Sequence, residues 1–168
     1  MKKYILFFII LVSISVNCQS QELWGWGRND LGQLGDGTIT ASLKPIRIGI
    51  ENDWKLISAG YDHTIGIKND GTLWTWGKNN YGQLGDGTVC TGGSEYSSEN
   101  NPSPIGCNSF NGRYIPVIID ESNFPTNSSF VSISTGFQHT CGIIDNNDLY
   151  CWGRNDDGQL GIGSIADV

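Results

Sequence analysis

The sequence predicts an all-β fold, a partial β-propeller built from repeated four-stranded units. One Gly-rich segment occurs three times, at residues 24–38, 74–88 and 150–164. The first two copies are identical at 11 of 15 positions, and the first and third at 10 of 15. Short alternating segments separated by Gly, Asn and Asp lie between the copies, and no helical period occurs beyond the N-terminus. Four strands in about fifty residues is the size of a propeller blade.

Residues 1–20 have the pattern of a secretory signal peptide. Lys2 and Lys3 precede an apolar run over residues 4–16, and small or polar residues follow. The run is shorter than the roughly 20 residues that a membrane-spanning helix needs. We expect cleavage after Ser20 and a secreted, periplasmic or cell-surface protein. The alternatives are a buried N-terminal helix and a lipoprotein anchored through Cys18.

The first unit, residues 21–50, is a partial blade. Its ELWGWG segment (22–27) alternates large and small residues as a strand does, and residues 28–38 supply turns. A short strand, PIRIG, follows at 45–49.

The second unit, residues 51–120, is a whole blade with an inserted loop at 89–114. We expect its strands at 55–60, 63–68, 72–77 and 116–119, with a tight NDG turn at 69–71. The third unit, residues 121–168, repeats this order at an offset of 76 and ends before a fourth strand.

The repeats resemble those of the regulator of chromosome condensation family. The resemblance rests on the Gly-rich motif, on SAGYDHT (58–64) and STGFQHT (134–140), and on the Trp-containing strands that follow them. It covers nearly all of the chain after residue 20 except the insert. It implies a seven-bladed ring of four-stranded blades, of which this chain supplies about two and a half. The remaining blades would come from a C-terminal continuation or from other copies.

The cysteine count after signal-peptide removal suggests two disulfides. Four cysteines remain, and they allow three connectivities. If Cys141 lies opposite Cys151, the hairpin loop is 145–147 and Asn147 takes the left-handed position that Gly71 takes in the second unit. Similar repeats in exported proteins carry a cysteine pair at these places. Cys90 and Cys107 then pair and tie down the insert; the rival four-cysteine metal site lacks a CxxC pair.

Residues that recur in every unit are interpreted as structural. His63 and His139 occupy one repeat position, and Trp26, Trp76 and Trp152 another, whereas a catalytic group is needed once. We therefore predict no catalytic residue, no metal and no cofactor. The competing interpretations are a catalytic histidine and an aromatic ligand platform.

The insert breaks the repeat and is the best candidate for binding. Its candidate contact residues are Tyr96, Phe110, Arg113 and Tyr114, because Tyr and Arg are frequent interface anchors on loops. A decorated surface loop without function is the alternative.

Charge argues against nucleic acid as a partner. The chain has a net charge of −7, and without Lys2 and Lys3 it keeps 8 basic and 17 acidic side chains, a net charge of −9. Phosphate binding needs basic groups. We expect an exported bacterial member of the family that binds a protein or other macromolecule without catalysis. The alternative that the resemblance implies is guanine-nucleotide exchange on a small GTPase, and a lyase or hydrolase at the ring centre is a third reading.

Overall fold

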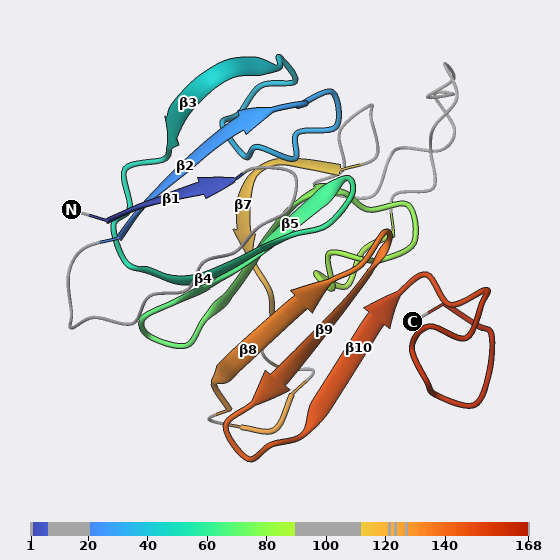
Figure 1. Cartoon of the computed structure of the whole chain (residues 1–168). Coiled ribbons are helices and arrows are strands. Elements are labelled where there is room, and N and C mark those ends of the chain that lie inside the picture. Colours follow the sequence, from blue (N-terminus) through green and yellow to red (C-terminus); the bar gives the residue numbers. More distant parts are fainter. Residues whose placement is uncertain are drawn as a thin grey trace, which may run out of the picture.

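The computed structural model describes residues 2–6, 21–89, 112–120, 122, 124–126 and 128–167, and their regular elements form three β-sheets (Figure 1). The first sheet has the order β1-β2-β3, the second β4-β5-β6-β7 and the third β10-β9-β8. The strands are β1 (Lys2–Leu6), β2 (Gln21–Gly27), β3 (Ser42–Ile48), β4 (Trp54–Ala59), β5 (His63–Lys68), β6 (Leu73–Lys78), β7 (Gly112–Ile118), β8 (Phe130–Thr135), β9 (His139–Ile144) and β10 (Leu149–Gly153).

The second sheet is a complete antiparallel meander. Consecutive strands pair throughout, as in Thr64↔Trp76 between β5 and β6 and Thr75↔Val117 between β6 and β7. In the third sheet, β8, β9 and β10 correspond to β4, β5 and β6 of the second sheet. In the first sheet, β2 and β3 correspond to β6 and β7. The predicted all-β architecture of partial blades is therefore confirmed.

The sheets bury their apolar faces against one another. One cluster joins the first and second sheets and includes Leu23, Ile48, Trp54 and Trp76. A second cluster joins the second and third sheets and includes Ile65, Leu73, Phe130 and Trp152. Burial of apolar surface between neighbouring units stabilises such arrays, so each sheet depends on the next for its core.

The predicted hairpin register is confirmed. Cys141 lies opposite Cys151, and the amide of Ile144 donates to the carbonyl of Asp148 over 3.1 Å. Asn147 has a φ of 73°, and Gly71 has a φ of 87° at the corresponding turn. Both positive φ angles are those expected of a three-residue hairpin loop whose last residue lies in the left-handed region.

The start of β7 corrects the predicted insert boundary. The prediction placed residues up to 114 in the loop, but β7 already begins at Gly112, which pairs with Lys78. An irregularity between Thr75 and Gly77 shifts the register and extends the pairing toward the N-terminus of β7.

The N-terminal segment also differs from expectation. We expected residues 1–20 to lie outside the fold, whereas Lys2–Leu6 pair in parallel with β2, from Lys2↔Gln21 to Leu6↔Gly25. An edge strand has unpaired backbone groups that a passing segment can satisfy. Removal of residues 1–20 as a signal peptide concerns processing and stays a prediction. Among the described residues, no helix has the length and apolar character needed to cross a membrane.

Candidate functional site

The turns and loops that follow β2, β4, β6, β8 and β10 gather at one end of the three sheets, which we call the loop end. The turns 60–62 and 136–138, the Gly-rich loops and the start of β7 all lie there, because equivalent strands run in the same direction in each sheet. Loops held by a rigid scaffold are the usual place for binding residues. The loop end is therefore the candidate functional site.

A buried asparagine organises each Gly-rich loop. The side-chain amide of Asn29 donates to the carboxylate of Asp36 and to the carbonyl of Thr38, while its oxygen accepts from the amide of Leu34. Asn79 makes the same three bonds in the second loop. Asn155 donates to the carbonyls of Ser164 and Ala166 and accepts from the amide of Leu160, because Ile162 stands where the other two loops have an aspartate. Sequence reasoning missed this role, although the asparagine recurs in all three copies of the motif.

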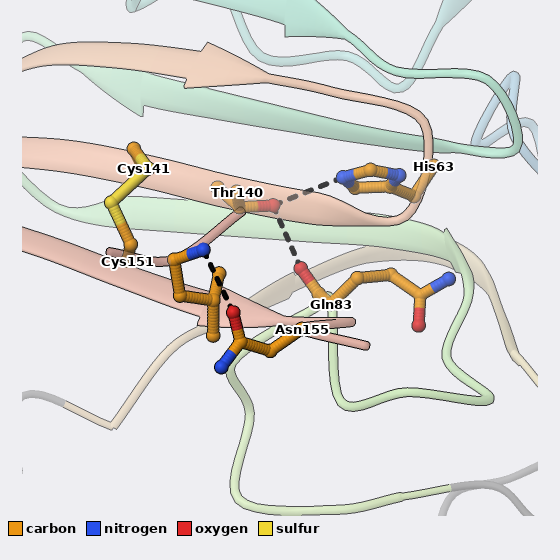
Figure 2. The surroundings of a disulfide bond; sticks show 7 residues. His63, Gln83, Thr140, Cys141, Cys151 and Asn155 are labelled. Atoms are coloured by element: carbon orange, nitrogen blue, oxygen red, sulfur yellow. Dashed lines mark hydrogen bonds between the residues drawn. A yellow bond between two sulfur atoms is a disulfide. The ribbon is translucent and has the colours of Figure 1, made fainter. Parts of the chain in front are cut away.

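The second and third sheets are each fastened to the Gly-rich loop of the sheet before them. The carbonyl of Gln83 accepts from the hydroxyl of Thr140 over 2.9 Å (Figure 2). The indole of Trp152 donates to the same carbonyl over 3.1 Å. The carbonyl of Gln33 accepts from Thr64 and Trp76 in the same way. We call this arrangement the Thr–Trp clamp. It gives Trp76 and Trp152 the structural role predicted for them, while Trp26 is half-buried in β2.

His63 adds a further hydrogen bond to the Thr–Trp clamp on Gln83. Its Nε2 lies 3.0 Å from the hydroxyl oxygen of Thr140 (Figure 2). That hydroxyl donates to the carbonyl of Gln83, so it accepts from the Nε2–H of His63. Burial, and secondarily the neighbouring His139, lower the pKa of His63 to about 3. A fixed, uncharged and fully buried imidazole serves packing between sheets rather than proton transfer to a ligand.

The two described candidate contact residues of the insert are used internally. The guanidinium of Arg113 makes two bonds, of 2.6 and 2.8 Å, to the carboxylate of Asp86, and both side chains are largely buried. The carbonyl of Tyr114 accepts from the amide of Gly37 over 2.9 Å, and its ring lies against Gly32. These contacts fix the start of β7, and both side chains are engaged within the protein.

The other predictions for the insert concern residues 90–111, which the structure does not describe. Tyr96, Phe110 and the Cys90–Cys107 pair lie outside the described residues. The Cys141–Cys151 disulfide is present and joins β9 to β10, with Cα atoms 4.1 Å apart (Figure 2). That distance is typical of a non-hydrogen-bonded cross-strand pair. In the part of the chain that the structure describes, no three His, Cys, Asp or Glu side chains converge as a metal site would require.

Two models of the regulator of chromosome condensation (RCC1) repeat match the chain, one over residues 21–67 and 70–143 and the other over 54–83 and 130–159. The chain belongs to the RCC1 repeat family. The matched segments contain both clamps and every strand of the three sheets except β1, which explains why the same hydrogen bonds recur.

Curated relatives share this similarity over most of the chain. The ultraviolet-B receptor UVR8 of Arabidopsis thaliana is 30% identical over 86% of the chain, which spans 27% of the receptor. The human X-linked retinitis pigmentosa GTPase regulator is 28% identical over 89% of the chain, which spans 12% of that protein. The chain thus spans about a quarter of the length of these relatives or less.

Solved structures show the same fold. Yeast RCC1 (Prp20), solved bound to Kap60, matches with a TM-score of 0.68 at 23% identity, over 88% of this chain and 31% of the yeast chain. A second structure of Prp20p from Saccharomyces cerevisiae, described with its binding to Gsp1p and histones, matches equally well over 32% of its length. The three sheets are therefore blades of an RCC1-type β-propeller, a fold that supports binding or regulation.

Proposed function

We propose that this protein is an exported RCC1-repeat propeller that binds another macromolecule through its loop end, without catalysis. The observation that carries the proposal is the anchored stem of the insert. The structure describes the chain up to Val89 and again from Gly112, on either side of the insert, and the Asp86–Arg113 ion pair joins these two sides. A loop that departs from the repeat but is fastened to rigid sheets is suited to present contact residues.

The stem is more strongly anchored than its counterpart in the first sheet. Asp86 accepts from Asn79, Thr88 and Arg113, whereas Asp36 accepts from Asn29 and Thr38 alone among the described residues. The extra arginine occurs where the insert rejoins the sheet. This coincidence supports a function for the insert that needs a fixed base.

Export is the second part of the proposal. The N-terminal pattern of residues 1–20 and the Cys141–Cys151 disulfide support it, because structural disulfides persist in oxidising compartments. The test is fractionation followed by thiol labelling. We expect the protein in the medium, periplasm or cell surface without free thiols at Cys141 and Cys151. A cytosolic protein with both thiols labelled would refute export.

Site-specific photo-crosslinking tests binding through the insert. A photoreactive residue replaces Tyr96 or Phe110 in the insert, and the matched control replaces Asp145 in the β9–β10 turn, at the opposite end of the third sheet. We expect a discrete adduct from the insert positions and none from Asp145. Equal adducts from all positions, or none from the insert, would contradict the proposal.

Regulation of a small GTPase is the second candidate. It is favoured by the similarity to a protein named as a GTPase regulator. Exchange acts by contacts that displace the nucleotide and needs no catalytic acid or nucleophile, so it is compatible with the buried histidine. The deciding assay measures release of labelled GDP from purified small GTPases. Acceleration by this chain, together with a cytosolic location, would replace the first candidate with the second.

A further inference from the structure

The Cys141–Cys151 disulfide lies next to both hydrogen-bond donors of the Thr–Trp clamp on Gln83. In the pairing of β9 with β10, Thr140 lies opposite Trp152, and the two cysteines form the adjacent pair (Figure 2). Thr140 and Trp152 both donate to the carbonyl of Gln83. One covalent bond therefore fixes the relative position of the two strands that carry the clamp donors.

The cysteines and the clamp donors lie on opposite faces of the third sheet. Successive side chains of a strand alternate between faces, so Cys141 and Cys151 face away from the second sheet while Thr140 and Trp152 face it. Both cysteines are half-buried, whereas both clamp donors are buried. The sulfurs thus lie on the face that the second sheet does not cover, where another thiol or disulfide can reach them.

β10 is attached on fewer sides than its counterpart β6. β6 pairs with β5 on one side and with β7 on the other, whereas β10 lies at the edge of the described third sheet and pairs with β9. Where the third sheet has Cys151, the second has Thr75, which pairs with Val117 of β7. The buried residue that β10 contributes to the apolar cluster between the sheets is Trp152. Among the described sheets, the disulfide therefore occurs in the one whose Trp-bearing strand is paired on one side.

We propose that oxidation of Cys141 and Cys151 closes the clamp on Gln83 and so locks the third sheet onto the second. In the reduced chain β10 moves away from the second sheet, and Thr140 and Trp152 no longer donate to Gln83. This inference rests on the proposed export, because thiols stay reduced in the cytosol and are oxidised outside it. The lock then forms after the chain has left the cytosol.

The oxidant is a disulfide, either of an exchange protein or of a small molecule such as glutathione disulfide. The thiolate of one cysteine attacks a sulfur of the oxidant, and the thiolate of the other cysteine displaces the oxidant from the mixed disulfide. One S–S bond forms in the chain and one breaks in the oxidant. The oxidant takes two electrons and the two thiol protons and leaves as two thiols. Reduction by a dithiol reverses the step.

A chain with one remaining disulfide allows the test. Cys18→Ser, Cys90→Ser and Cys107→Ser leave Cys141 and Cys151 as the two cysteines of the full chain. This background is oxidised with glutathione disulfide or reduced with dithiothreitol, and unfolded with urea in each state.

Two threonine variants in this background report on the clamps. We expect the fold-change that Thr140→Val causes in the unfolding equilibrium constant to be at least about fivefold smaller in the reduced chain, because its hydroxyl no longer donates there. Thr64→Val, the matched control in the clamp on Gln33, should cause the same fold-change in both states. Equal effects of Thr140→Val in both states would overturn the proposal, since a disulfide that only restricts the unfolded chain acts independently of the clamp. An equal reduction for Thr64→Val would show general loosening and would also overturn it.

Amide hydrogen exchange locates the opening. In the reduced chain, the β10 amides should exchange by local opening, at a rate that low concentrations of urea leave unchanged. The β6 amides, which lie between two paired strands, should exchange by unfolding and faster as urea is added. The same urea dependence in both strands would contradict the lock.

The outcomes for the lock and for export are separable. Equal Thr140→Val effects in a protein found outside the cytosol with blocked thiols would overturn the lock and leave export standing. A cytosolic protein that shows the smaller Thr140→Val effect after reduction would refute export and support the lock.

Discussion

Replacing Thr140 with valine should destabilise the protein more than the equivalent change at Thr64. Both hydroxyls are buried, and each donates over 2.9 Å to the carbonyl of a glutamine in the preceding sheet. Valine has nearly the same shape and cannot donate. In both variants the carbonyl keeps a tryptophan indole as its donor. The loss of this one hydrogen bond should therefore cost about 1 kcal/mol at either site.

The difference between the two sites comes from His63. Only Thr140 also accepts from a histidine, so Thr140→Val leaves the buried Nε2–H of His63 without an acceptor. A buried unsatisfied donor costs about 1–3 kcal/mol. We expect a total loss of about 2–4 kcal/mol for Thr140→Val, against about 1 kcal/mol for Thr64→Val.

Urea unfolding followed by tryptophan fluorescence measures both losses as shifts of the midpoint at constant slope. A double-mutant cycle of Thr140→Val with His63→Leu measures the coupling free energy between the two side chains, which should be about 1–2 kcal/mol. Equal destabilisation by the two threonine variants, or a coupling near zero, would refute the clamp as described.

Three other predictions follow from the same geometry. Because the pKa of His63 is lowered from 6.5 to about 3, the unfolded chain binds an extra proton between these values. The free energy of unfolding should thus fall as the pH drops below 6.5, by up to about 1.4 kcal/mol per pH unit more than in His63→Gln. Parallel pH profiles of unfolding free energy for the two proteins would contradict this. Replacing both Cys141 and Cys151 with alanine should lower stability by about 2–3 kcal/mol in the chain-entropy model, and added reductant should then have no further effect on that hairpin. Gly85→Ala should destabilise the protein more than Gly161→Ala. A Cβ at position 85 would lie 2.6 Å from the indole nitrogen of Trp152, whereas nothing lies within 4 Å of a Cβ at position 161. Similar unfolding midpoints for the two variants would argue against this contact.

Much of the scaffold could be predicted because its causes are local. The hairpin around Asn147 follows from the left-handed preference of one position, and the same argument holds at Gly71. Recurrence in successive repeats predicts structural roles for His63 and Trp76 from the sequence alone. These features depend on side-chain type and spacing, which a sequence records directly.

The remaining features depend on the backbone or on distant pairs. The acceptor of each clamp is a main-chain carbonyl, so no side chain marks it. The prediction left Arg113 available because it placed residues up to 114 in the insert, whereas β7 begins at Gly112 and Arg113 pairs with Asp86. The two partners lie 27 positions apart in the sequence, so no local pattern marks the ion pair. The stacking of Tyr61 on Phe137 likewise requires knowing that their turns are neighbours in space.

The direction of the clamps has a consequence for biosynthesis. In both, the accepting carbonyl precedes its donors along the polypeptide, by 31 and 43 residues for Gln33 and by 57 and 69 for Gln83. A ribosome releases the chain from its N-terminus, so every newly emerging blade meets a receptor loop that has already been made. Assembly of the array can thus proceed by addition, with each completed unit acting as the template for the one still being translated.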